Sequence, residues 1–208
     1  LMSTPWTPWH EVVEIREDVK SGDLSMQAFA ARLHDVIAQD GDRPIYENPT
    51  EFFKLTFPTR SIRDLTRDVA ERLRGEGTKA VRSLSLTYGG GKTHTLITLY
   101  HLFRNPSELP DLPSVQEFRG AAGDLPQARV AALPFNDLDL ERGIAMRGPS
   151  GDTRRLIEPW SAIAYALAGD DGLRILHGEG KAEERSSPPA TNVLEELFQL
   201  PQEEGLST

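Results

Sequence analysis

Residues that could bind phosphate lie in the stretch SLSLTYGGGKTHTL, residues 83–96. Phosphate binding requires backbone N–H groups that point to one place, a helix N-terminus behind them, and no side chains in the way. Gly89, Gly90 and Gly91 meet the last condition, and a helix that begins near Lys92 would meet the second. We therefore interpret this stretch as a candidate phosphate loop.

The residues after the glycines supply the remaining parts of a nucleotide site. Lys92 has the length and charge to reach the β- and γ-phosphates of ATP, and the hydroxyl of Thr93 is a suitable ligand for Mg2+. The predicted cofactor-binding segment runs from Gly89 through His94, with Thr93 as the metal ligand. The expected cofactors are ATP and Mg2+. The sequence assigns no catalytic residue.

The motif departs from the usual pattern G-x-x-x-x-G-K-S/T at its first position. Leu86 stands where the opening glycine usually allows a tight exit from the preceding strand. The alternative is a glycine-rich turn between a strand and a helix that binds nothing. A predicted strand before the glycines, a predicted helix after them and the Lys92-Thr93 pair at the right offset together favour a nucleotide site.

Hydrophobic periodicity indicates the elements that would position this loop. Residues 80–86 have no helical signal and predict a strand, whereas the apolar residues of 92–105 occupy more than one side of a helix and predict a buried one. A second strand is expected over 128–135, then a polar surface excursion over 136–155 and a helix over 158–169. Strand, glycine loop and buried helix in this order form the first half of a βαβ unit.

The first third of the chain has the spacing of helices. Apolar residues recur with helical periodicity over 8–20, 25–41 and 61–77. Ser61 is expected to cap the last of these helices, with Asp64 as the acidic partner of a capping box. The three phenylalanines of residues 48–58 are expected to anchor that segment in the core.

These elements predict an α/β fold with an incomplete P-loop NTPase-type core, preceded by a helical N-terminal region. The expected division is a helical region over residues 1–76 and the N-terminal part of a P-loop nucleotide-binding domain over 77–208. A last amphipathic helix is expected over 192–200.

Composition limits the classes of function. The absence of cysteine excludes disulfides and thiolate metal sites. No run approaches 18 apolar residues and the N-terminus lacks the pattern of a signal peptide, so we expect a cytoplasmic protein that does not contact a membrane. The net charge is -9, and no basic stripe is present, so direct nucleic-acid binding is not expected.

Other polar residues give weaker signals. His94 and His101 lie seven residues apart on one face of the same predicted helix, which is more typical of packing than of a metal site. Arg154 and Arg155 are more typical of a charged surface before a helix than of a phosphate-sensing pair.

The segment LTYGGGKTHTLITLYHLF, with NPTEFFKLTFPTRSIRDL upstream and PATNVLEELFQLPQEEGLST downstream, resembles the domain-of-unknown-function family DUF499. Members of this family are predicted P-loop, AAA+-like ATPases of bacteria and archaea, often encoded beside DNA methyltransferases and helicases in anti-phage defence clusters. The family also replaces the opening glycine of the motif. The resemblance therefore implies that Leu86 is a family variant, and that Gly89, Gly91, Lys92 and Thr93 have phosphate and magnesium roles.

The resemblance also draws attention to a missing element. In such proteins the segment similar to EEGLST continues into a hydrophobic strand with a terminal acidic pair, the Walker B element that holds Mg2+. Here the sequence ends at Thr208, and nowhere else do four apolar residues precede Asp-Glu. We therefore expect the ATP-binding portion of an ATPase, with impaired hydrolysis, in a defence or DNA-processing complex with methyltransferase or helicase subunits. The alternative is a protein-interaction module with a vestigial glycine loop, in which the helical region and the acidic tail dock partner subunits.

Overall fold

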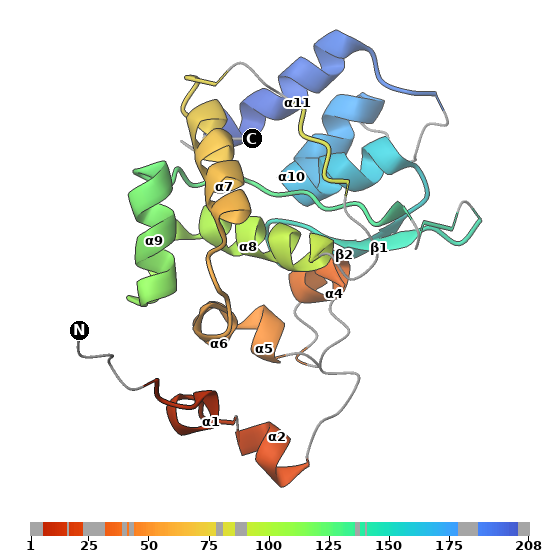
Figure 1. Cartoon of the computed structure of the whole chain (residues 1–208). Coiled ribbons are helices and arrows are strands. Elements are labelled where there is room, and N and C mark those ends of the chain that lie inside the picture. The colour runs from red at the N-terminus through yellow and green to blue at the C-terminus, as the bar shows by residue number, and fades with distance from the viewer. Residues whose placement is uncertain are drawn as a thin grey trace. The chain divides into compact units, whose positions relative to one another are not determined.

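The computed structural model describes residues 6–15, 17–22, 32–38, 41, 44–77, 81–85, 91–135, 138–139, 141–178 and 187–203. The chain divides into two units, Leu1–Ala30 and Ala31–Thr208. Helices dominate both units, and the strands among the described residues form one two-stranded sheet (Figure 1). The boundary expected at residues 76 and 77 falls inside the second unit and stays a prediction. No helix in the described part of the chain is long and apolar enough to cross a bilayer.

The described residues of the first unit form two short helices, α1 (Trp9–Val12) and α2 (Glu17–Ser21). The prediction of a single helix over 8–20 is wrong, although the helical character of the region is confirmed. Val13 adopts an extended backbone (φ -119°, ψ 124°) and ends α1. The pair of β-branched valines at this point favours extended structure, and no residue of α1 is buried, so no packing opposes that preference.

The second unit begins with four helices: α4 (Leu33–Ala38), α5 (Pro44–Glu47), α6 (Pro49–Lys54) and α7 (Arg60–Leu73). The helix expected over 25–41 is confirmed where it coincides with α4, and residues 23–31 lie outside the described residues. Helix α6 starts at a well-formed cap, because the Asn48 side chain accepts hydrogen bonds from the amides of Thr50 (2.8 Å) and Glu51 (3.3 Å).

Two of the three phenylalanines near α6 anchor it as expected. Phe52 and Phe53 are each 1% exposed, whereas Phe57 is 79% exposed. The prediction for Phe57 is therefore wrong. This residue follows the end of α6 at Lys54, so the helical geometry that turns Phe52 and Phe53 into the core does not extend to it.

Helix α7 begins two residues earlier than its sequence suggests. Thr59 is the N-cap, and its hydroxyl accepts a hydrogen bond from the amide of Ile62 (3.4 Å). The prediction of Ser61 as the cap is wrong, because Arg60 and Ser61 already form the first turn. Gly75 has a left-handed backbone (φ +79°) and terminates the helix as expected.

Helix α8 (Lys92–Arg104) lies at the centre of the main core, with α4 to one side (Figure 1). A short 3-10 helix η1 (Pro106–Glu108) and α9 (Pro113–Ala122) follow, and α9 packs against α7. The prediction that α8 is buried on more than one side is confirmed. The core around it contains Val36, Phe52, Phe53, Ala70, Ile97, Tyr100, Leu102, Phe103, Val115, Phe118, Ala122 and Ala128.

The predictions of a strand over 80–86 and of a second strand over 128–135 are both wrong in the described residues. Residues 81–85 form no strand, and Val81 is 85% exposed. Residues 129–134 form none either, and only Ala128 makes an isolated bridge. A strand requires a hydrogen-bonded neighbour, and among the described residues neither segment has one along its length.

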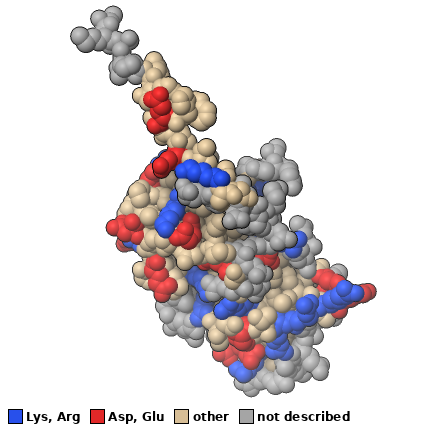
Figure 2. Space-filling view, turned by 90° about the horizontal axis from the view of Figure 1, so that it is seen from below, with Lys and Arg blue, Asp and Glu red and all other residues tan. Residues whose placement is uncertain are grey.

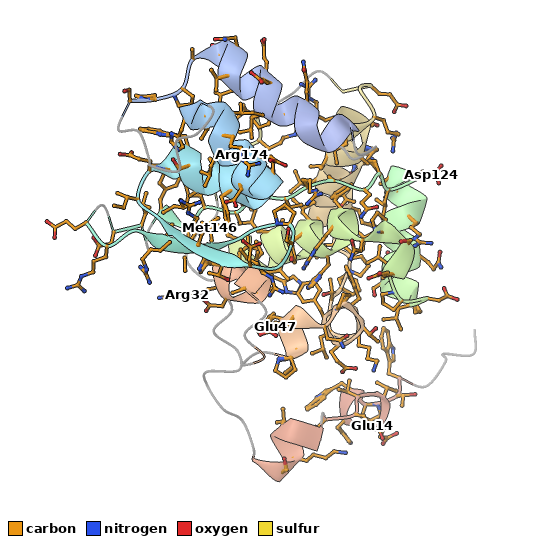
Figure 3. The ribbon with its side chains drawn as sticks, turned by 180° about the vertical axis from the view of Figure 1, so that it is seen from behind. Glu14, Arg32, Glu47, Asp124, Met146 and Arg174 are labelled. Carbon is orange, nitrogen blue, oxygen red and sulfur yellow. The ribbon has the colours of Figure 1, made fainter. Side chains whose placement is uncertain are left out.

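The observed sheet lies where a polar surface excursion was expected. Strands β1 (Ile144–Arg147) and β2 (Thr153–Leu156) form an antiparallel hairpin in which Ile144 pairs with Leu156. That expectation is therefore wrong. Ile144 and Met146 alternate with half-buried residues, as in a strand with one face on a core. Met146, labelled in Figure 3, packs in a cluster with residues of α10.

Helix α10 (Pro159–His177) is interrupted and reverses direction. Gly169 has a non-helical backbone (φ 61°, ψ -140°) in its interior. The Ser161 hydroxyl lies 3.3 Å from Nε2 of His177, although sixteen residues of straight helix would separate them by about 24 Å. The predicted helix over 158–169 thus corresponds to the first half of a helical hairpin. Helix α11 (Thr191–Glu203) packs against it and includes the expected helix over 192–200.

Candidate functional site

Helix α8 begins directly after the last glycine of the predicted loop. Gly91 precedes the helix with a left-handed backbone (φ 82°, ψ 18°) that residues with a Cβ rarely adopt. Its carbonyl accepts hydrogen bonds from the amide (2.9 Å) and hydroxyl (3.0 Å) of Thr95. The helix therefore begins at Lys92, as the sequence predicts.

No side chain of the described residues caps this helix. The N-cap residue is glycine, and the first turn contains no acidic residue. The first amides of an α-helix have no acceptor within the helix, and the aligned peptide dipoles place partial positive charge at the same end. The N-terminus of α8, which is 13 residues long, can therefore accept an anion.

The side chains of Lys92 and Thr93 are half-buried at this end of the helix. Thr93 also lines a mostly apolar cavity of about 670 Å3, together with residues of α4, α7, α8 and the segment 128–134. The structure thus brings Gly91, Lys92 and Thr93 together. Gly89 and Gly90 lie outside the described residues, and so does Leu86.

His94 contacts α6 and the residues that follow it. Its Nε2 lies 3.2 Å from the Thr56 hydroxyl, and its ring centre lies 4.7 Å from that of Phe52. Thr56 donates its only hydroxyl proton to the carbonyl of Phe52 (2.8 Å), so it accepts a hydrogen bond from Nε2–H of His94. The imidazole therefore holds the first turn of α8 against the α6 region. A role for His94 in cofactor binding stays a prediction.

His101 packs on the same phenylalanine two turns later. Its ring centre lies 5.3 Å from that of Phe52, and its Nε2 donates to the carbonyl of Tyr46 (2.7 Å). The interpretation of His94 and His101 as packing residues is confirmed. Their seven-residue spacing identified the shared face, but no local signal in the sequence indicates that Phe52 lies between them.

Burial of the two imidazoles predicts pH-dependent stability. Burial lowers the pKa of His94 below its ordinary value of 6.5. It also lowers the pKa of His101, where the carbonyl of Tyr46 acts in the opposite direction and the charge of Arg104 adds to the lowering. The folded protein therefore resists protonation of these rings, so it loses stability as the pH falls through 6.5, where the unfolded chain takes up protons.

We expect the free energy of unfolding to be lower at about pH 5.5 than at about pH 7.5, by at most about 1.4 kcal/mol per histidine per pH unit. Urea unfolding at the two pH values measures this difference. A protein carrying both His94→Gln and His101→Gln should show a smaller difference than the unchanged chain. An equal difference in the two proteins would assign the pH dependence to other groups.

Arg154 and Arg155 bind groups of the hairpin and α10. Arg154 lies 3.2 Å from a carboxylate oxygen of Asp170, and Arg155 donates to the carbonyls of Arg142 (3.1 Å) and Gly143 (2.8 Å). These contacts join β2 to neighbouring segments and agree with the structural interpretation of the pair.

The comparison with known families adds a classification. A protein-family model described as the DUF499 N-terminal domain matches residues 9–134. The chain belongs to the DUF499 family. The DUF499 match includes the glycine loop and α8 and ends before β1, so the downstream segment that begins at Pro189 lies outside it. No curated protein and no solved structure matches the chain.

Proposed function

We propose that this DUF499 chain is the ATP-binding portion of a P-loop ATPase and binds ATP with Mg2+ at the start of α8. The observation that carries the proposal is the N-terminus of α8, which no described side chain caps and where left-handed Gly91 directly precedes Lys92 and Thr93. A Cβ at Gly91 would meet no atom of the described residues within 4 Å, which supports close approach of a ligand to this residue.

Each group at this turn has a defined part in the proposal. The backbone amides of the first turn would bind phosphate oxygens, and the ammonium of Lys92 would contact the terminal phosphates. The hydroxyl of Thr93 would be a protein ligand of Mg2+, which neutralises phosphate charge when bound. We propose binding with little hydrolysis by this chain, because phosphoryl transfer also needs a group that positions the attacking water, and neither the sequence nor the described residues identify one.

The wider role is proposed from the family resemblance. We infer an incomplete α/β P-loop core in a cytoplasmic protein that works in an anti-phage defence or DNA-processing complex, with methyltransferase or helicase subunits as partners. Function at this level depends on the site and its partners rather than on the fold. Titration with ATP and Mg2+ tests nucleotide binding at the start of α8 whatever the partners are.

Calorimetric titration with ATP and Mg2+ tests the site. Replacement of Lys92 by alanine should weaken binding at least about tenfold, because charge-assisted hydrogen bonds to phosphate contribute about 1.5–3 kcal/mol. Lys54→Ala is the matched control, since Lys54 lies on α6 and forms an exposed ion pair with Glu51 (2.7 Å). Equal heats from the unchanged chain and the Lys92→Ala protein would refute the proposed site.

The second candidate function is a protein-interaction module with a vestigial glycine loop. The observation that favours it is a set of exposed large apolar residues in the first unit: Trp6 97%, Trp9 74%, Val12 67%, Val13 56%, Ile15 57% and Val19 47%. Exposed apolar groups of this kind are typical of contact surfaces. If a non-hydrolysable ATP analogue with Mg2+ leaves the melting temperature unchanged, the interaction module becomes the better explanation.

A further inference from the structure

Three arginines from separate elements line one cavity in the second unit. Arg104 ends α8, Arg129 follows α9, and Arg147 ends β1. The cavity they line has a volume of about 270 Å3 and is called the basic cavity below. Its other lining residues are uncharged: Ile37, Tyr100, Asn105, Gln127, Ala128, Val130, Gly148, Pro149 and Ala166. The described lining therefore carries three positive charges and no carboxylate.

Two of these guanidinium groups, those of Arg104 and Arg147, interact electrostatically with the side chain of Tyr100. Arg104 donates a hydrogen bond to the Tyr100 hydroxyl, and its guanidinium carbon lies 5.4 Å from the centre of the tyrosine ring. Burial raises the pKa of Tyr100, and the positive charges of Arg104 and Arg147 both oppose that rise. Arg104, Arg147 and Tyr100 all line the basic cavity.

Neither Arg104 nor Arg147 forms an ion pair with any residue that the structure describes. Arg147 donates to the carbonyl of Ala38 (2.6 Å), which is neutral. By contrast, Arg63 and Arg82 each contact a carboxylate, at 2.7 and 2.9 Å. Figure 2 shows one face of the surface, on which acidic and basic side chains are also interspersed. Arg104 and Arg147 are half-buried positive charges without a counter-charge among the described residues, which is unfavourable, so a bound anion would offset the cost.

We propose that the basic cavity binds a small phosphate-bearing anion. The planar, forked guanidinium group matches phosphate oxygens in pairs, and Asn105, Gln127 and the Tyr100 hydroxyl add uncharged polar groups to the lining. The volume is just below the range of about 300–1,000 Å3 that holds drug-sized ligands, so the cavity suits inorganic phosphate, pyrophosphate or a small phosphorylated molecule.

This site is separate from the proposed nucleotide site. Arg104 and Lys92 stand at opposite ends of α8, and the rise per residue of an α-helix puts them about 18 Å apart. The same groups therefore cannot serve both ligands, and either site can exist without the other.

Calorimetric titration of the whole chain with pyrophosphate tests the proposal. The Lys92→Ala protein is the starting point, because that change removes the lysine of the proposed nucleotide site. In this background Arg104→Gln or Arg147→Gln should weaken pyrophosphate binding at least about tenfold. Arg60→Gln should have no effect, since Arg60 is 90% exposed and does not line the basic cavity. Binding that is unchanged by both cavity substitutions would overturn the proposal, as would the absence of binding.

A second measurement needs no substitution at the basic cavity. Phenylglyoxal modifies accessible arginines, and mass spectrometry can follow the extent of reaction at each one. Pyrophosphate should slow modification of Arg104, Arg129 and Arg147 while Arg60 reacts at an unchanged rate. Equal rates at the three cavity arginines with and without pyrophosphate would refute the site, even if the glutamine variants fail to fold.

Discussion

A Gly172→Ala protein should unfold with a free energy about 3 kcal/mol lower than that of the unchanged chain. The second half of α10 returns past the first, and a Cβ at Gly172 would lie 2.3 Å from the carbonyl oxygen of Ala164 and 2.9 Å from its carbonyl carbon. It would also lie 3.2 Å from Cδ1 of Leu197 in α11. Backbone atoms cannot move aside as a flexible side chain can, so the two halves of α10 must separate.

Urea unfolding measures this effect, and Gly120→Ala is the matched control. Gly120 lies within α9, and a Cβ there would meet no atom within 4 Å. Alanine favours the helix over glycine, so this protein should be more stable by about 0.5–1 kcal/mol. Both substitutions replace glycine by alanine, but they should change the free energy of unfolding in opposite directions. A stabilised Gly172→Ala protein would contradict the reversal of α10.

The helices around the candidate site could be predicted from the sequence because their signals are local. Apolar residues at helical spacing located α7 and α8, and the glycines before Lys92 marked where α8 begins. The left-handed backbone of Gly91 has the same local origin. Predictions of this kind succeed because each depends on residues within a few turns of one another.

The strands could not be placed in the same way. Residues 81–85 and 129–134 carry the composition of strands, but strand formation depends on a partner whose position the pattern does not contain. The actual hairpin has a two-residue alternation at Ile144 and Met146 that was hidden by the charged residues around it. Gly143 and Gly151, both with positive φ, flank its strand and turn and were the available signal.

Tertiary packing determines the parts of the site that the sequence did not reveal. The hydrogen bond between His94 and Thr56 joins residues 38 positions apart. The basic cavity depends on the ends of α8 and β1 and the segment after α9, which no motif connects. The sequence therefore did not reveal the contacts with distant segments that hold α8 in place.

Phe52 makes several of the contacts that hold α8 in place. Its replacement by alanine should lower the free energy of unfolding by about 3–5 kcal/mol. Its ring is 1% exposed and lies within 4.7 Å of the His94 ring and 5.3 Å of the Phe53 and His101 rings, measured between centres. Removal leaves a cavity beneath the first turn of α8. Urea unfolding of the purified variant measures the loss.

Phe57→Ala provides the comparison, because Phe57 is 79% exposed and its loss should change stability by no more than about 0.5 kcal/mol. The pKa of His94 supplies a second readout. Burial lowers this pKa, so exposure of the imidazole in a still folded Phe52→Ala protein should raise it toward 6.5, as NMR titration can measure. Similar losses of stability from both phenylalanines would contradict the packing of α6 on α8. An unchanged pKa in the Phe52 variant would show that another group buries His94, and that the first turn of α8 keeps its position without this ring.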